Sequence, residues 1–202
     1  MHRWAAVAAF VLVASSGCAA GDDDPALRGA VRNPPLEVAS VVLPDVADGR
    51  AVPMRAPASE LYIIYFGYTS CPDVCPTTLS DIRVALEDLP ADLADRVTVG
   101  MATVDPERDT DAVLTGYLGH FFDRSLALRT TDPAQLAAAA EVFGVQWEIA
   151  DHDPGEAYDV SHTAVTYVVD DGGRVVVEWP FGFDHRSMTA DLKTLLTEEP
   201  TT

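Results

Sequence analysis

The hydrophobic residues of this chain fall into two alternating patterns. Short apolar runs, which are typical of strands, are separated by stretches in which apolar residues recur every three or four positions, which is typical of helices. The run over residues 61–66 is rich in aromatic and β-branched side chains and predicts a central strand buried on both faces. The other predicted strands span residues 36–43, 50–54, 97–104, 126–129, 163–169 and 174–179. The predicted helices span residues 76–89, 111–122, 133–143 and 187–196.

The order of these elements predicts one α/β domain over residues 36–202. The turn at residues 44–49 makes an N-terminal β-hairpin from the first two strands, and the turn at residues 170–173 joins the last two. Strands that alternate with helices, followed by a hairpin and a final helix, indicate a central mixed sheet flanked by helices. This order matches a thioredoxin-like fold.

The first 17 residues predict an export signal. Arg3 supplies a positive end, residues 4–14 form an apolar core too short to span a bilayer, and small residues precede Cys18. The pattern is similar to a bacterial lipoprotein signal, in which Cys18 becomes the lipid-bearing N-terminus; an ordinary signal peptide cut nearby, or an uncleaved anchor, is the alternative. We therefore expect an extracytoplasmic domain, lipid-anchored to the bacterial cell membrane. Residues 18–35, acidic and proline-rich, predict a flexible tether.

The charge balance argues against one class of partner. The chain has 13 Lys and Arg residues against 32 Asp and Glu residues, which gives a formal net charge of −19. Dense phosphate binding needs basic residues, and the sequence shows no basic patch, so nucleic acid is not an expected partner. The acidity is typical of a solvated surface that aids solubility, although a cationic partner could also dock through it.

Cysteine usage indicates where the chemistry lies. The chain has three cysteines, and with Cys18 assigned to lipid only Cys71 and Cys75 remain. They lie between the 61–66 strand and the helix that Pro76 opens, at the edge of the sheet where loops lead into helices. Because a helix N-terminus favours an anion, we expect the pKa of the Cys75 thiol to be lowered. Such a pair can form a disulfide, exchange with another disulfide, or bind a soft metal.

The two cysteines could also form a structural disulfide, but a disulfide that closes so short a loop constrains little of the unfolded chain. A third ligand nearby would favour a metal site instead. Four of the five histidines follow the export signal, namely His120, His152, His162 and His185. His162 lies in a loop at the start of the 163–169 strand, which thioredoxin-like packing brings against the cysteine segment. It is the predicted metal ligand. The other three are expected to be ordinary surface or loop residues.

An acidic segment, residues 104–110, follows the second buried strand at the same edge. In one interpretation, Asp105 shapes the turn, and Asp109 or Thr110 caps the next helix. In the other, Asp105 and Asp109 support the site, either by orienting the cysteine loop or by presenting charge to a partner. Direct ligation by these hard oxygens is less favoured while two thiolates are present.

Together these residues resemble the Sco/SenC family of copper-binding, thioredoxin-like proteins involved in cytochrome c oxidase assembly. The signature Phe-Gly-Tyr-Thr-x-Cys-Pro-Asp-x-Cys-Pro is met by residues 66–76, and the segment Asp-Pro-x-Arg-Asp-Thr by residues 105–110. The family's late histidine is met by His162. The resemblance covers residues 36–196. It implies that copper, as Cu(I) or Cu(II), is bound by Cys71, Cys75 and His162.

The resemblance implies two functions and leaves both open. One is a copper metallochaperone that supports assembly of the dinuclear copper centre of cytochrome c oxidase. The other is an extracytoplasmic thiol-disulfide oxidoreductase, in which Cys71 and Cys75 reduce the client's copper-site cysteines. The expected partners are the oxidase subunit that carries the copper centre, other copper chaperones and a thioredoxin-like reductant. A lipoprotein binding module with a merely structural disulfide is a third possibility. Many family members are held by a membrane helix, so the lipid anchor rests on the Cys18 pattern alone.

Overall fold

The computed structural model describes residues 27–153 and 155–197. The predicted export signal, Cys18 and residues 18–26 of the predicted tether lie outside the described residues. Within the two described ranges, no helix combines the length and the apolar character needed to cross a membrane.

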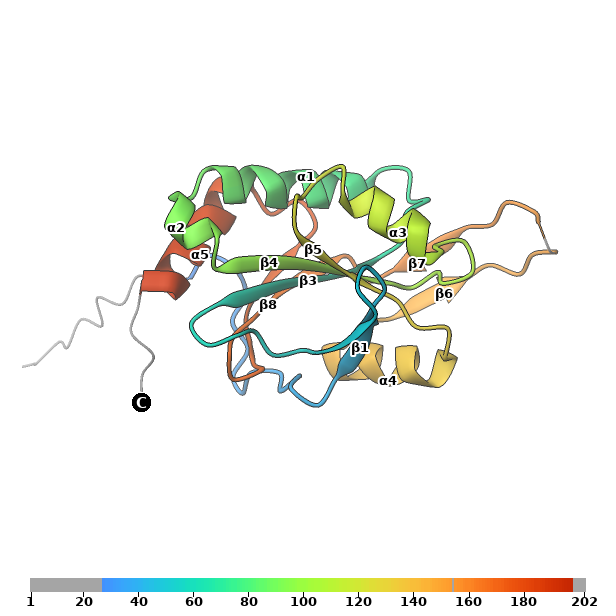
Figure 1. The fold of residues 1–202 in the computed structure, drawn as a ribbon, viewed down its shortest axis with the longest axis horizontal. Coiled ribbons are helices and arrows are strands. Elements are labelled where there is room, and N and C mark those ends of the chain that lie inside the picture. The colour runs from blue at the N-terminus through green and yellow to red at the C-terminus, as the bar shows by residue number, and fades with distance from the viewer. Residues whose placement is uncertain (1–26, 154, 198–202) are drawn as a thin grey trace, which may run out of the picture.

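A seven-stranded mixed sheet runs through the centre of the fold (Figure 1). Within it, strand β3 (Leu61–Gly67) is parallel to β4 (Val97–Thr103) and antiparallel to β8 (Val165–Val169). Every residue of β3 and β4 is buried, so the prediction that these apolar runs form central strands is confirmed. The sheet also contains β1 (Val42–Asp45), β2 (Arg50–Pro53), β5 (Ser125–Leu128) and β9 (Val175–Pro180). The strand order is β2-β1-β5-β4-β3-β8-β9.

Helices cover both faces of this sheet, and Figure 1 shows α4 alone on the face opposite the other four. The five helices of the described chain are α1 (Val74–Glu87), α2 (Ala91–Ala94), α3 (Asp111–Leu118), α4 (Pro133–Phe143) and α5 (His185–Thr197). On the α4 side, the ring of Phe143 packs against Phe66 and Tyr167 of the sheet, with centroids 5.2 and 5.1 Å apart. The predicted α/β architecture, with its flanking helices and N-terminal hairpin, is confirmed.

Three parallel strands end at one edge of the sheet. Since β3, β4 and β5 run in the same direction, the segments that follow them meet at this edge. The cysteine segment follows β3, and the acidic segment 104–110 follows β4. The backbone N–H of Val104 donates to the carbonyl oxygen of Gly67 at 2.9 Å, which fixes the two segments side by side. Both predicted groups of functional residues therefore lie at the same edge.

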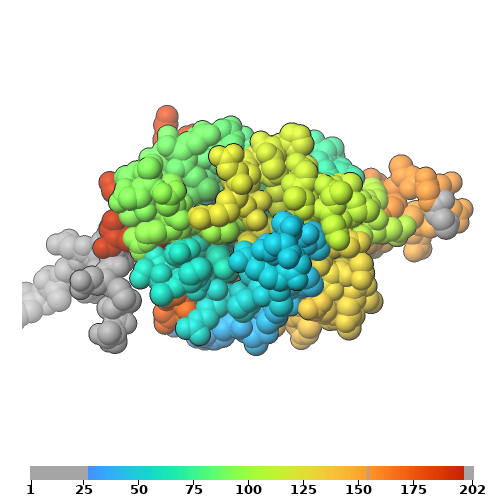
Figure 2. Space-filling view, viewed as in Figure 1, coloured from blue at the N-terminus to red at the C-terminus, as the bar shows by residue number. Residues whose placement is uncertain are grey.

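The sequence pattern misses a second sheet of two strands, β6 (Trp147–Ile149) and β7 (Val160–His162). Strands of three residues, separated by a long polar segment, give no periodic signal. The hairpin extends from the body of the molecule at the right of Figures 1 and 2. His162 is the last residue of β7, opposite Trp147. The prediction that His162 lies in a loop is therefore wrong, although β8 does begin only three residues later, at Val165.

Several predicted boundaries also shift. Residues 36–41 do not form a regular strand and have only an isolated bridge between Glu37 and Arg174. The first helix begins at Val74, two residues before Pro76, so Cys75 lies inside its first turn. The third helix ends at Leu118, before residues 119–122, which the apolar pattern assigned to it. The predicted helix was too long because Phe121 and Phe122 extend its apolar pattern, although they contact the core from a non-helical turn.

Residues 27–31 are docked on the domain, so the prediction of a flexible tether that runs to residue 35 is too long. The backbone N–H groups of Arg28 and Gly29 donate to the buried carboxylate of Asp191 at 2.6 and 2.9 Å. Ala30 exchanges two backbone hydrogen bonds with Glu178 of β9, both 2.9 Å long. These residues cover the outer edge of β9, which is the last strand of the sheet.

Candidate metal centre

The cysteine loop connects β3 to α1 and begins with a glycine that the packing requires. A Cβ atom at Gly67 would lie 2.7 Å from Cε1 of Tyr65 and 3.1 Å from Sγ of Cys75. Both distances are shorter than ordinary carbon contacts, so a hydrogen at this position lets the sulfur of Cys75 lie against the end of β3. Pro76 follows within the first turn of α1, where its missing N–H leaves no hydrogen bond unmade.

The structure brings the three predicted ligands together. Sγ of Cys71, Sγ of Cys75 and a ring nitrogen of His162 all lie within 4.8 Å of one another. Sγ of Cys75 is 3.5 Å from Nε2 of His162, and the backbone N–H of Cys75 donates to Sγ of Cys71 at 3.3 Å. Both cysteines are free thiols. Two sulfurs and one imidazole form a soft donor set, which fits a copper ion better than a hard cation such as Mg²⁺.

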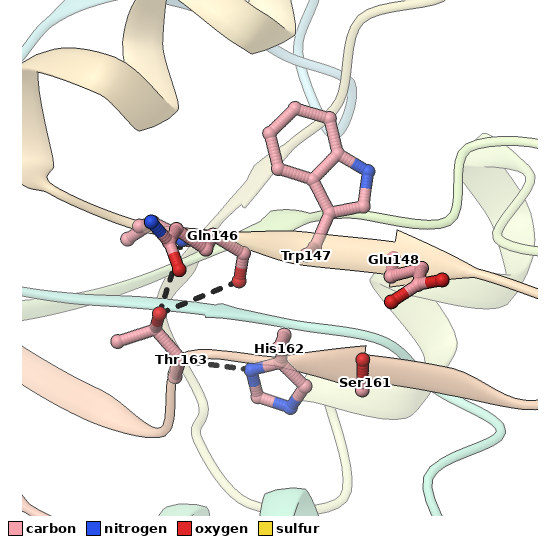
Figure 3. Close-up of a pocket in the computed structure, with 7 residues that line it drawn as sticks. Gln146, Trp147, Glu148, Ser161, His162 and Thr163 are labelled. Carbon is pink, nitrogen blue, oxygen red and sulfur yellow. Dashed lines mark hydrogen bonds between the residues drawn. The ribbon is translucent and has the colours of Figure 1, made fainter.

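The hydrogen bonding of His162 leaves Nε2 available to bind a metal. Its Nδ1 lies 3.0 Å from the carbonyl oxygen of Thr163, which can only accept, so Nδ1 carries the proton. The lone pair is then on Nε2, the nitrogen that faces Cys75. Burial lowers the pKa of His162, and the imidazole is therefore neutral at neutral pH. Figure 3 shows the Nδ1 contact, together with the hydrogen bonds that join Gln146 to Thr163.

The two thiols differ in environment. Burial raises the pKa of Cys75 to about 12, because a charged sulfur is disfavoured in the core. For the half-buried Cys71, burial also acts to raise the pKa, but hydrogen bonds from the backbone N–H groups of Cys75 and Asp73 outweigh it and lower the pKa. The expectation of a lowered pKa at Cys75 is therefore wrong. The start of α1 favours the thiolate at Cys71, which lies just outside the helix.

Two tyrosines that the sequence interpretation did not single out surround the imidazole. The rings of Tyr65 and Tyr68 meet the His162 ring edge-on, each with centroids 5.8 Å away. The Tyr65 hydroxyl donates to Sγ of Cys75 at 3.6 Å, and the Tyr68 hydroxyl donates to the carbonyl oxygen of Val160 at 3.0 Å. Their positions on either side of Gly67, within the cysteine signature, are the available sequence signal. Both tyrosines restrict the movement of ligand residues.

Asp109 holds the cysteine loop in place. Its buried carboxylate accepts hydrogen bonds from the backbone N–H of Thr69 at 3.1 Å, the Thr69 hydroxyl at 2.5 Å and the Thr103 hydroxyl at 2.6 Å. Asp105 is also buried and accepts from the hydroxyl of Tyr158 at 2.7 Å and from Nε of Arg108. Neither carboxylate can present charge to a partner, so that alternative is wrong. The cap of α3 is Thr110, whose hydroxyl accepts from the backbone N–H of Val113.

The remaining histidines of the described chain lie away from the three ligands. His120 is exposed after α3, and His185 is the first residue of α5. His152 stacks on Tyr158 with centroids 3.7 Å apart, so it takes part in the packing of the β6–β7 hairpin. An open hollow of about 680 Å³ lies on this hairpin beside His162, and its lining includes Trp147, Glu148 and Ser161 (Figure 3). Of the three predicted ligands, His162 alone lines this hollow.

The fold and the site define a class of protein, a thioredoxin-like domain with two thiols and one imidazole placed to bind a metal. The SCO1/SenC family model matches residues 45–197. The chain therefore belongs to the SCO1/SenC family, which confirms both the resemblance and the predicted thioredoxin-like fold.

Known relatives agree with this assignment. The chain is 33% identical to apo Sco1 from Thermus thermophilus, with a TM-score of 0.72 over 83% of this chain and 95% of that one. It is 34% identical to Bradyrhizobium japonicum ScoI with copper bound, with a TM-score of 0.65 over 82% and 97% of the two chains. It is 37% identical to a SCO2-like protein of Rickettsia prowazekii over 116 residues, which is 57% of this chain and 56% of the relative. The chain thus spans about half the length of the curated relatives it matches.

Proposed function

We propose that this protein is a copper chaperone that binds copper through Cys71, Cys75 and His162. The observation that carries the proposal is the convergence of two sulfurs and an unprotonated imidazole nitrogen within 4.8 Å. Thiolates and imidazole are ligands that copper prefers. Two relatives support the choice of metal: the structure of ScoI from Bradyrhizobium japonicum has copper bound, and a protein of Stutzerimonas stutzeri named as a putative copper-binding protein is 36% identical over 102 residues, 50% of this chain and 49% of that one.

The environments of the ligands suggest how copper is taken up. Cys71 is half-buried and its pKa is lowered by hydrogen bonds from the backbone N–H groups of Cys75 and Asp73, so it is the thiol that ionises more readily and the one that we expect to meet the incoming ion. Cys75 is buried and remains protonated at neutral pH, so it must release its proton when it ligates copper. Nε2 of His162 needs no deprotonation. Copper uptake is therefore expected to release close to one proton from Cys75.

Copper titration of the purified, reduced full chain tests this proposal. We expect near-stoichiometric binding, with a strong sulfur-to-copper charge-transfer band for Cu(II). Cys71→Ser and His162→Ala should each weaken binding, whereas His120→Ala, which changes an exposed histidine away from the site, serves as the matched control. Copper affinity that is unchanged by both ligand substitutions would contradict the proposal.

A second function is favoured by the difference between the two thiols. A reductase of client disulfides needs an accessible thiolate that attacks and a second thiol that resolves the mixed disulfide, and Cys71 and Cys75 match these roles. The Cys71 thiolate would bond to one client sulfur and release the other as a thiolate. The proton of Cys75 would pass to the released client thiolate, and the Cys75 sulfur would then displace the second client sulfur from Cys71. Two electrons pass to the client, and a Cys71–Cys75 disulfide remains.

Equilibration with glutathione redox buffers separates this function from an inert disulfide. A reductase requires a measurable exchange rate and a reduction potential above that of structural disulfides. A pair that neither reduces nor reoxidises with small thiols would exclude thiol-disulfide exchange. Full function of a variant with both cysteines changed to serine would instead favour a binding module whose disulfide is merely structural.

We propose that the client is the cytochrome c oxidase subunit that carries the dinuclear copper centre, as membership of the SCO1/SenC family supports. Other copper chaperones or a thioredoxin-like reductant would supply copper or electrons. The domain would act outside the cytoplasm, anchored to the bacterial cell membrane by lipid on Cys18. Metabolic labelling with a radioactive fatty acid tests the anchor, because Cys18→Ser should abolish the label. Pull-down of the oxidase subunit with the copper-loaded chain tests the client.

A further inference from the structure

The side chain of Arg108 connects two segments that are far apart in the sequence. Its Nε donates to the buried carboxylate of Asp105, and its Nη1 donates to the backbone carbonyl of Tyr158 at 3.0 Å. The guanidinium carbon also lies 3.7 Å from the centroid of the Tyr158 ring, within stacking distance. Arg108 therefore binds Tyr158 through both its backbone and its ring.

Tyr158 is held from several directions. Its hydroxyl donates to Asp105 at 2.7 Å, and its ring stacks on His152 as well as on Arg108. We call Arg108, Asp105 and Tyr158 the arginine clamp. Tyr158 lies two residues before β7, the strand that ends with His162. The clamp therefore acts on the strand that supplies the imidazole.

The β6–β7 hairpin has few other hydrogen-bonded links to the domain. Its two strands pair with each other and form a sheet separate from the central one. The hydroxyl of Tyr68 donates to the carbonyl oxygen of Val160, which is one further link. Apart from the clamp and this link, His162 is held by nonpolar packing: the rings of Tyr65 and Tyr68 flank it, and Val160 packs in the core.

The clamp belongs to the same short segment that fixes the cysteines. Asp109, next to Arg108, accepts the hydrogen bonds from the backbone and hydroxyl of Thr69 in the cysteine loop. Residues 105–109 therefore hold the thiols on one side and the imidazole on the other. Arg108 has no hydrogen bond to the cysteine loop, and its guanidinium carbon lies 5.7 Å from the centroid of the Tyr68 ring in that loop. A change at Arg108 should therefore disturb the imidazole side more than the thiol side.

We propose that Arg108 and Tyr158 are positioning residues that hold the β6–β7 hairpin, and with it Nε2 of His162, in place against the two cysteine sulfurs. This inference rests on the proposed copper-binding function. Groups that orient metal ligands without touching the metal commonly change affinity by about 10–100-fold when they are removed. Arg108 reaches His162 only through Tyr158, which lies four residues earlier in the chain, so we expect an effect at the lower end of this range.

Copper release from the loaded full chain to a competing chelator tests the proposal. We expect Arg108→Gln to speed release about tenfold and to weaken the imidazole nitrogen coupling in the electron paramagnetic resonance spectrum of the Cu(II) form. Arg108→Lys should fall between Arg108→Gln and the wild type, because lysine keeps the charge but loses the planar stack. Arg174→Gln is the matched control, since Arg174 makes a comparable ion pair with Asp170 at the β8–β9 turn.

A double-mutant cycle distinguishes positioning from general loosening of the fold. If Arg108 acts through the imidazole, Arg108→Gln should add little to the effect of His162→Ala. An equal effect in both backgrounds, or release at the wild-type rate, would overturn the proposal. Tyr158→Phe removes only the hydroxyl bond to Asp105 and provides a milder variant if Arg108→Gln does not fold.

Hydrogen exchange of the copper-free chain keeps the failure of this inference separate from the failure of the proposed function. The backbone N–H of Thr163 donates to the carbonyl oxygen of Gln146 at 2.9 Å and reports whether the hairpin is intact. Arg108→Gln should speed exchange at this amide whether or not the chain binds copper. Unchanged exchange would overturn the clamp, whereas faster exchange in a chain that fails to bind copper would overturn the proposed function alone.

Discussion

Replacement of Gly67 by alanine should damage the metal site through a steric clash. The added methyl group would lie 2.7 Å from Cε1 of Tyr65 and 3.1 Å from Sγ of Cys75. Carbon atoms in contact normally lie about 3.5–4.0 Å apart, so the overlap with Tyr65 is about 1 Å. Both neighbouring side chains are fully buried and have no space to move into. Overpacking of this kind costs about 1–3 kcal/mol of unfolding free energy.

Gly116→Ala provides a matched control with the opposite sign. Gly116 lies within α3, and a Cβ atom there would meet no atom within 4 Å. Alanine should stabilise this helix by about 1 kcal/mol, because glycine has the greater backbone freedom in the unfolded chain. Urea unfolding of the reduced, copper-free chain measures both substitutions, and copper titration measures the displacement of the Cys75 sulfur. Equal unfolding free energy and equal copper affinity for Gly67→Ala and the wild type would refute the packing argument.

Three further predictions follow from single contacts. Tyr65→Phe removes the hydrogen bond to Cys75, which leaves the sulfur a stronger electron donor. In the Cu(II) form, the charge-transfer band should therefore move to lower energy in the optical spectrum, and the copper reduction potential should fall in a redox titration. In the reduced chain, iodoacetamide should modify Cys71 well before Cys75, because the pKa of Cys71 is lowered and that of Cys75 is raised from 9.0 to about 12. The stability that protonated Cys75 contributes should be complete below pH 9 and lost as the pH rises towards 12, which urea unfolding across this range would detect. Asp191→Ala leaves three buried or partly buried N–H donors without their acceptor, including Nε1 of Trp179, and should lower the unfolding free energy by about 3 kcal/mol, with an unchanged midpoint contradicting this account.

Elements with a strong local signal could be predicted from the sequence. The bounds of α4 agree with the prediction, because Asp132 accepts from the N–H of Ala134 at its start and Gly144 adopts φ 71° at its end. The buried strands β3 and β4 follow from their continuous apolar runs. Within the site, the spacing of Cys71 and Cys75 identified the thiol pair, and the packing expected of a thioredoxin-like fold brought His162 to it.

Features that depend on distant contacts could not be predicted. The β6–β7 hairpin is attached through Arg108 and Tyr158, which are fifty positions apart, so no local pattern announces it. The raised pKa of Cys75 comes from burial beside β3, whereas the helix start alone indicates a lowered value. The docking of Arg28 depends on Asp191, at the opposite end of the chain. In each case the missing information was the identity of the partner across the fold.

The docked N-terminal segment limits how far the domain could travel from a membrane. If lipid is attached at Cys18, ten residue steps separate the anchor from Arg28, the first of the described residues with a hydrogen bond to the rest of the domain. Ten steps span at most about 35 Å, against about 60 Å for a linker that runs to residue 35. A shorter linker confines the domain to a thinner layer above the bilayer, which raises its effective concentration near a membrane-embedded client about twofold. Asp191, on the last helix, would thus limit the distance from the membrane that the copper site can reach, although Asp191 is not one of its ligands.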